Sequence, residues 1–160
     1  MQDEDRSAVR DLLESHNTLS LATCRDGKPW NASLFFASDK HLNIYFVSDY
    51  RTQHARHIQE SDTAVAAINA DCGLWTDVRG LQVEGRVTVT SGLERMNALR
   101  YYLAKFRDVK ALFESPKDDN EQTIAERLKA ANMYCLKPSW IRLIDNSRWF
   151  GYKAEFDLEG

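Results

Sequence analysis

Hydroxyl, aromatic and cationic side chains gather at one point of the chain, where an apolar run ends and a helical pattern begins. Residues 42–47 are mostly apolar, and residues 48–58 read Ser-Asp-Tyr-Arg-Thr-Gln-His-Ala-Arg-His-Ile. Ser48 and Thr52 offer hydroxyls, and Arg51 offers a planar guanidinium that binds phosphate through parallel hydrogen bonds. The free backbone N–H groups of a starting helix also attract anions. This pattern predicts a phosphate site, although an ordinary helix cap with a solvated polar face explains the same residue types equally well.

Other chemistries find weaker support in the sequence. His54 and His57 lie three residues apart on the expected helix, but no convincing third ligand and no His-Glu-x-x-His pattern accompanies them. We therefore predict no metal site. No Gly-x-Ser-x-Gly motif indicates a serine hydrolase. Cys24, Cys72 and Cys135 are widely separated and predict reduced, packed thiols.

Composition limits the class of protein. With 160 residues, of which 43% are apolar, the chain is long enough for one substantial core, and we predict a single domain over residues 1–160. The net charge of -3 argues against nucleic-acid or anionic-membrane partners. The amino terminus lacks the pattern of a signal peptide, and no apolar stretch approaches the roughly 20 residues of a membrane span. We expect a cytoplasmic protein.

Hydrophobic periodicity predicts the helices and strands that would position the polar residues at 48–58. The pattern predicts an amphipathic helix at the amino terminus, then three antiparallel strands, a polar helix and two further strands. Gly85, within the last of these strands, predicts a bulge or a close backbone approach. The expected ranges are 3–16 for the first helix, 18–24, 30–37 and 42–47 for the strands, 50–59 for the polar helix, and 63–69 and 78–90 for the next two strands.

The second half of the chain is predicted to be helical before it returns to strands. Ser91 and Glu94 form a capping-box pattern ahead of a helix that ends at about residue 107. We expect this helix to bury Met96, Leu99, Leu103 and Phe106. Helical segments at 109–113 and 121–131 follow, and residues 133–144 and 149–158 predict the closing strands. The fold class is therefore mainly β with α, a six- to seven-stranded antiparallel split barrel with an N-terminal helix and helices inserted between the later strands.

Two segments carry a resemblance to a known family. Residues 46–55 with Ile58 can be laid without gaps on the Phe-Phe-Thr-Asn-Tyr-x-Ser-Arg-Lys-Gly-x-x-Leu motif of pyridoxamine 5'-phosphate oxidases. Residues 79–87, Arg-Gly-Leu-Gln-Val-Glu-Gly-Arg-Val, resemble that family's Arg-Gln-Val-Arg-x-Glu-Gly strand. The ending 136–151 is similar to the small UPF0306 or YhbP-like branch, which has Asp-Asn-(Thr/Ser) with Phe-Gly soon after. The resemblance spans about residues 8 to 150 and implies an FMN-binding split barrel that forms homodimers with the flavin between subunits.

The resemblance also implies roles for individual residues. Ser48 and Thr52 would lie near the FMN phosphate, while Gln53 and His54 stand where the family has an Arg-Lys pair. The missing charge would come from Arg51, and from His54 if it is protonated beside the phosphate. A site with less positive charge is expected to bind flavin less tightly.

The remaining contacts concern the flavin ring. Residues 31–36 align with the strand that lines the ring, and Gln82 stands two residues after Gly80, which occupies the place of the family's flavin-contacting Gln. Trp149, with Phe150, would either stack over the flavin or serve as packing or dimer contacts, and Arg148 is either a substrate contact or an exposed turn residue. The implied cofactor-binding residues are Asn31, Ala32, Ser33, Val47, Ser48, Arg51, Thr52, Gln53, His54, Gln82 and Trp149.

Two functions from different classes remain open. The first is an FMN-dependent oxidoreductase acting on a small molecule, with a nicotinamide electron donor possible. The second is a non-catalytic dimer, either flavin-binding or flavin-free, that keeps the barrel without the chemistry. Oxidation of pyridoxamine phosphate is not expected, because the oxidase's Trp and Arg-Leu-His signature are absent near the carboxyl end. Related barrels also hold haem or the deazaflavin F420, but neither an axial His or Cys nor a basic groove stands out, so FMN leads.

Overall fold

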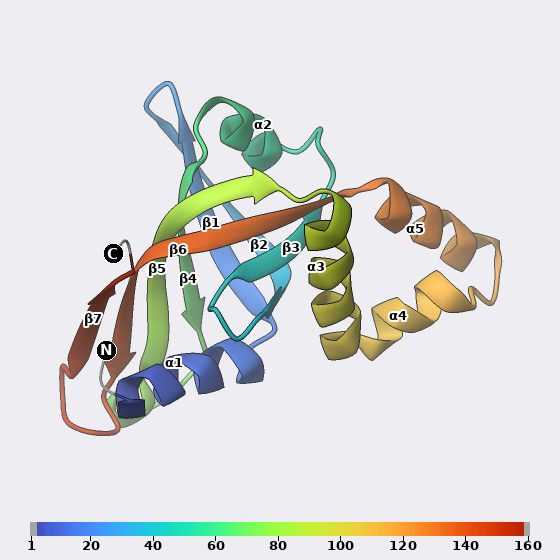
Figure 1. Cartoon of the computed structure of the whole chain (residues 1–160). Coiled ribbons are helices and arrows are strands. Elements are labelled where there is room, and N and C mark those ends of the chain that lie inside the picture. Colours follow the sequence, from blue (N-terminus) through green and yellow to red (C-terminus); the bar gives the residue numbers. More distant parts are fainter. Residues whose placement is uncertain (1–2, 159–160) are drawn as a thin grey trace.

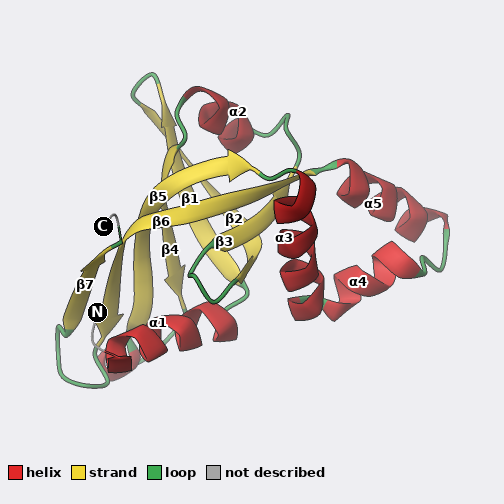
Figure 2. Cartoon of the chain, viewed as in Figure 1, coloured by secondary structure: helices red, strands yellow, loops and turns green. Residues whose placement is uncertain are grey.

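The computed structural model describes residues 3–158, which form a small antiparallel barrel decorated with helices (Figures 1 and 2). This confirms the predicted fold class. Most of the expected ranges agree with the observed ones to within a few residues. The elements are α1 Asp3–Ser15, β1 Thr18–Arg25, β2 Lys28–Ser38, β3 Ile44–Ser48, α2 Gln53–Glu60, β4 Thr63–Asn69, the 3-10 turn η1 Trp75–Asp77, β5 Arg79–Val89, α3 Gly92–Lys105, α4 Arg107–Glu114, α5 Asp119–Ala130, β6 Asn132–Asp145 and β7 Lys153–Asp157.

Six strands close the barrel and a seventh extends it. Neighbouring strands follow the order β3-β2-β1-β4-β5-β6, and pairing of β3 with β6 completes the ring. Strand β6 is long enough to border two partners in turn. Its first residues, from Asn132 to Leu136, pair with β3, and residues 140–144 pair with β7. Among the described strands, β7 is the one with a single partner, and closure limits unwanted strand pairing.

Helix α1 closes one end of the barrel, at the bottom of Figure 1. Its apolar face places Val9, Leu12 and Leu13 in the same buried cluster as the inward-facing residues of the strands. Lys105 at the end of α3 donates to the carbonyl oxygens of Leu13 and His16, and so provides a cation at the negative end of α1. Helices from the two halves of the chain are thereby tied together at this end.

The predicted irregularity at Gly85 is a β-bulge. Pairing between β5 and β6 runs from Glu84 opposite Trp140 to Gly85 opposite Pro138, which passes over Ser139. The β6 backbone approaches Gly85 so closely that a Cβ there would lie 2.2 Å from the carbonyl oxygen of Lys137. Only glycine fits this approach, and the bulge lets the long strands bend around the barrel.

Helices α3, α4 and α5 are inserted between β5 and β6, and α4 and α5 project away from the barrel (Figure 1). Two expectations for α3 are wrong. Met96 is 69% exposed, and the buried residues of this helix are Ala98 and Tyr102. Ser91 occupies the N-cap position, but its side chain makes no capping hydrogen bond, so the sequence pattern does not form a capping box.

Two further expectations are corrected elsewhere in the fold. Trp149 does not begin a strand, because it lies in the turn that precedes β7. Among the cysteines only Cys135 is packed, whereas Cys24 and Cys72 are exposed thiols. None of the helices between residues 3 and 158 is both long and apolar enough to cross a membrane.

Candidate functional site

Three of the predicted phosphate ligands converge where β3 gives way to α2. Ser48 is the last residue of β3, Thr52 is the N-cap of α2, and His54 lies in the first turn of that helix. The Nε2 atom of His54 lies 2.7 Å from Ser48 Oγ and 3.2 Å from Thr52 Oγ1, and the two hydroxyl oxygens are 3.3 Å apart. We call Ser48, Thr52 and His54 the junction cluster.

The direction of these hydrogen bonds follows from Thr52. Its hydroxyl donates to the carbonyl oxygen of Asp49 at 2.8 Å, so Thr52 Oγ1 can only accept from His54. The imidazole proton is therefore on Nε2, which also donates to Ser48 Oγ. Ser48 keeps its own hydroxyl hydrogen, which it can donate to Thr52 Oγ1 at 3.3 Å or to an oxygen atom of a ligand.

The junction cluster is electrically neutral. Burial, and then the nearby His57, lower the pKa of His54, because both disfavour a positive charge on the imidazole. This is opposite to the expectation that a protonated His54 replaces part of the charge of the Arg-Lys pair. The fold itself therefore supplies hydrogen-bond donors at this position and no cation.

Arg51 does not supply a free charge either. Its guanidinium binds the neighbouring Asp49 through two hydrogen bonds, from Nε at 2.9 Å and from Nη2 at 2.6 Å. The pair lies at the surface, and hydrogen bonding to Arg51 lowers the pKa of Asp49 to about 2. An incoming phosphate would have to compete with this carboxylate for Arg51.

A second buried histidine holds α2 against the barrel and was not recognised in the sequence. His57 Nδ1 lies 3.1 Å from Thr23 Oγ1 on β1, and His57 Nε2 lies 3.0 Å from the side-chain nitrogen of Gln53. Gln53 is therefore directed along the helix to His57 and not to the junction cluster. The buried positions of α2 are His54, Ala55, His57 and Ile58, and this spacing marks one helix face even though half of its residues are polar.

The residues expected near a flavin ring share the outer face of the sheet, with one exception. Strand register places Ser33 beside Ser20, Ser20 beside Ala67, Ala67 beside Gln82, and Gln82 beside Arg142. We call these five residues the outer row. Since side chains alternate along a strand, Asn31 faces the same way as Ser33. Ala32 faces inward, opposite the fully buried Leu21.

The outer row consists mostly of small side chains and contains one amide, that of Gln82, whose orientation is fixed by a hydrogen bond. Serine and alanine leave little above the sheet, so that a planar molecule can lie close to the backbone. Gln82 Oε1 accepts a hydrogen bond of 3.0 Å from Arg142 Nη1, and Arg142 Nε donates to Glu155 at 2.8 Å. These contacts fix the orientation of the Gln82 amide.

Val47 and Trp149 are not brought to the junction cluster. Val47 precedes Ser48 on β3, so its side chain points to the opposite side of the strand, where it lines a cavity under α3, α4 and α5. Trp149 lies in the β6–β7 turn, at the other end of the barrel from α2 (Figure 1). It is 62% exposed and its ring meets Tyr152 edge-on, with the ring centroids 4.4 Å apart.

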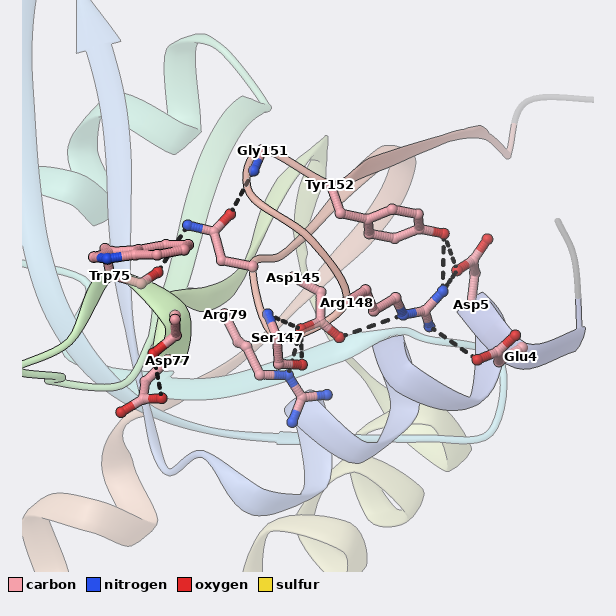
Figure 3. Close-up of polar contacts among 12 residues, drawn as sticks. Glu4, Asp5, Trp75, Asp77, Arg79, Asp145, Ser147, Arg148, Gly151 and Tyr152 are labelled. Carbon is pink, nitrogen blue, oxygen red and sulfur yellow. Dashed lines mark hydrogen bonds and ion pairs between the residues drawn. The ribbon is translucent and has the colours of Figure 1, made fainter.

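The β6–β7 turn is held by a network of charges around Arg148 (Figure 3). Arg148 donates to Asp5 at 2.8 Å and to Tyr152 at 2.9 Å, and forms an ion pair of 3.5 Å with the buried Asp145. The interpretation of Arg148 as an exposed turn residue is therefore wrong, because its side chain is only 20% exposed and its guanidinium links this turn to α1, while a contact with substrate stays a prediction.

The neutral state of His54 leads to a prediction about pH. An unfolded histidine takes up a proton near pH 6.5, whereas the lowered pKa of folded His54 delays that uptake. The free energy of unfolding should therefore fall as the pH drops below 6.5, and His54→Gln should flatten this fall. Urea unfolding at several pH values measures the slope. His41→Gln, at an exposed turn, is the control and should keep the slope; an unchanged slope in His54→Gln would contradict the assignment.

Comparison with known proteins gives one family and several structural neighbours. The profile of a family described as pyridoxamine 5'-phosphate oxidase matches residues 6–142. A UPF0306 protein of Klebsiella pneumoniae (strain 342) is 22% identical over 154 residues, which cover 96% of this chain and 93% of that one. The UPF0306 protein YhbP of Salmonella schwarzengrund is 23% identical over 151 residues, which cover 94% and 91%.

The solved structures that resemble this one share its fold at low identity. A heme binding protein from Mycobacterium smegmatis superposes with a TM-score of 0.74 at 16% identity, covering 98% of this chain and 59% of that chain. Campylobacter jejuni ChuZ gives a TM-score of 0.74 at 13% identity, covering 99% and 61%. The shared architecture is the split barrel.

Proposed function

We propose that this chain, which belongs to the pyridoxamine 5'-phosphate oxidase family, binds FMN between two copies of itself and acts as a flavin-dependent oxidoreductase on a small molecule. Residues 1–160 would form one FMN-binding domain. The observation that carries the proposal is the junction cluster, in which two hydroxyls and one imidazole N–H meet at the start of a helix. The Ser48 hydroxyl of this cluster and the free N–H groups of the helix start suit the phosphate of FMN.

The chain's own residues would do three things. Ser48 would donate its hydroxyl hydrogen to a phosphate oxygen, with His54 and Thr52 fixing its orientation, and the free N–H groups of the first turn of α2 would also donate. The outer row would support the flat ring system, with Gln82 as the hydrogen-bonding group that Arg142 holds in place. Bound FMN would supply hydride transfer.

A second copy of the chain explains the separation of Trp149 from the junction cluster. Within one chain these residues lie at opposite ends of the barrel, so Trp149 would reach a flavin only from the partner subunit (Figure 1). The outer face also carries exposed Phe35 and Val65, apolar side chains that a subunit interface would cover. Both features favour a homodimer with the flavin at the interface.

The absorption spectrum of the purified protein after FMN loading and desalting tests the proposal. We expect flavin bands to be retained at about one FMN per subunit, and complete loss of the bands would exclude tight FMN binding. Because solved neighbours include proteins named for heme, a parallel sample is loaded with haem. A retained Soret band without flavin bands would favour a haem-binding function instead.

Reduction of the bound flavin separates an enzyme from a binder. We expect NADH or NADPH to bleach the flavin absorbance in the absence of oxygen at a rate suited to turnover. If neither donor reduces the bound flavin, the non-catalytic flavin-binding dimer becomes the better account. This measurement requires the FMN-loaded protein, so it distinguishes an enzyme from a binder only after FMN binding has been established.

The Asp49–Arg51 pair gives a sharper prediction about affinity. Asp49→Asn removes the carboxylate that holds Arg51, so it should tighten FMN binding several-fold, whereas Arg51→Ala should weaken it by about tenfold. Fluorescence titration of FMN measures both variants. Asp62→Asn, which frees Arg86 at a distant surface position, is the matched control and should change nothing. Equal affinities in all three variants would move the phosphate site elsewhere.

A further inference from the structure

A cavity lies on the other side of β3 from the junction cluster. It lies between strands β3 and β6 and the inserted helices α3, α4 and α5, is partly open to solvent, and has a volume of about 150 Å³. Most of its wall is apolar. The residues that form this wall include Val47, Leu99, Tyr102, Val109, Phe113 and Met133.

The size of this cavity suits one aromatic ring. An apolar cavity of about 150 Å³ in a protein core stays dry and takes up benzene. The wall here also contains two aromatic side chains, Tyr102 and Phe113, which can meet a ligand ring edge-on or in an offset stack. Met133, which is buried in the wall, adapts its shape to a ligand and makes favourable contacts with aromatic rings.

Two cations complete the lining. Arg95 comes from α3 and Lys129 from α5, and both are long side chains whose charged ends can reach the rim of an apolar cavity. Arg95 donates to the carbonyl oxygen of Ala131 at 3.2 Å, and Lys129 lies 5.9 Å from the centre of the Phe113 ring. Neither forms an ion pair with a carboxylate of residues 3–158, so both positive charges are left for a ligand.

We infer that this cavity binds a small aromatic carboxylate of the size of benzoate. The ring would occupy the apolar space between β3 and the helices, and the carboxylate would accept charge-assisted hydrogen bonds from Arg95 and Lys129. This site is separate from the proposed flavin site, because successive side chains of β3 alternate between the two: Val47 faces the cavity and Ser48 faces α2. Binding of the aromatic carboxylate therefore does not depend on FMN binding.

The three methionines of the chain provide the measurement. Protein labelled with ¹³C at the methionine methyl groups is titrated with sodium benzoate and followed by NMR. The Met133 signal should shift and saturate in the millimolar range or below, while the signal of Met96, which is exposed on α3, should stay in place. A Met133 signal that does not move, or a Met96 signal that moves equally, would overturn the site.

Variants test the two parts of the site separately. Arg95→Gln combined with Lys129→Gln should weaken benzoate at least tenfold and leave benzene binding unchanged. Lys110→Gln, which removes one positive charge at an exposed ion pair of α4, is the surface control and should bind benzoate as before. Leu99→Trp should fill the cavity and abolish binding of both ligands. If that variant does not fold, Val109→Phe at another wall position serves the same purpose. Benzylammonium that binds as tightly as benzoate would show that the cations do not select the ligand.

Discussion

Gly85→Ala is expected to lower the free energy of unfolding by about 3 kcal/mol. The added Cβ would lie 2.2 Å from the carbonyl oxygen of Lys137 and 2.9 Å from the Cα of Pro138. Both are backbone atoms of β6, so no side-chain rotation relieves the contact. The two strands must separate or the bulge must move, and either change disturbs a long pairing of the closed barrel.

Urea denaturation followed by tryptophan fluorescence measures this loss as a shift of the unfolding midpoint. Gly73→Ala is the matched control, since a Cβ at Gly73 meets no atom within 4 Å. It should change the free energy of unfolding by no more than about 0.5 kcal/mol. Similar midpoints for the two variants would show that the bulge can accept a side chain, and would contradict the close approach of the two strands.

Asp145→Asn should cost about 2 to 3 kcal/mol of stability, because it removes a buried negative charge that faces two arginines. Only 3% of the Asp145 side chain is exposed, and its carboxylate lies 3.2 Å from Arg79 Nε and 3.5 Å from Arg148 Nε (Figure 3). The amide keeps the size and one acceptor oxygen, which can still bind the Ser147 hydroxyl. The loss therefore reflects the removed charge together with the one acceptor oxygen that becomes an NH2 donor facing an arginine. The arginines remain partly exposed, which keeps the cost moderate.

The control for this variant breaks an equivalent pair at the surface. Asp62→Asn removes the partner of Arg86 at an N–O separation of 3.2 Å, but both side chains are largely in water. Such a pair contributes less than about 1 kcal/mol. Chemical denaturation of the two variants side by side gives the comparison. If Asp62→Asn were the more destabilising, burial of the Asp145 network would not be what stabilises the β6–β7 turn.

The barrel could be predicted from the sequence because its signals are local and repeated. Alternating apolar residues identified the strands, the acidic first turn and apolar stripe identified α1, and Gly85 indicated the bulge. The prediction for Met96 failed for a physical reason. Helical spacing shows which residues share a helix face, but it does not show which face is buried. Helix α3 packs on the barrel through Ala98 and Tyr102, a small and a large residue whose fit depends on the shape of the barrel surface opposite them.

The candidate site was predicted in position but not in its electrostatics. Ser48, Thr52 and His54 do meet, because a strand end and a helix start are adjacent in the chain. The sequence did not reveal that Asp49 would form an ion pair with Arg51, since several nearby groups could equally have formed hydrogen bonds with the Asp49 carboxylate. Nor did it reveal that His54 would be buried. A histidine on a polar helix is predicted to be exposed unless the packing of α2 on β1 is known.

The insertion of α3, α4 and α5 has a consequence for how this protein can change. Val89 and Tyr134 are paired across β5 and β6, and the Thr90 N–H donates to the Met133 carbonyl at 2.8 Å, so the insertion leaves and re-enters the barrel at adjacent points. The entropy of closing a loop between two such points grows only with the logarithm of its length. Helices can therefore be lengthened, shortened or exchanged here at little cost to the barrel. Ligand preference in this part of the molecule is free to diverge while the strands stay the same.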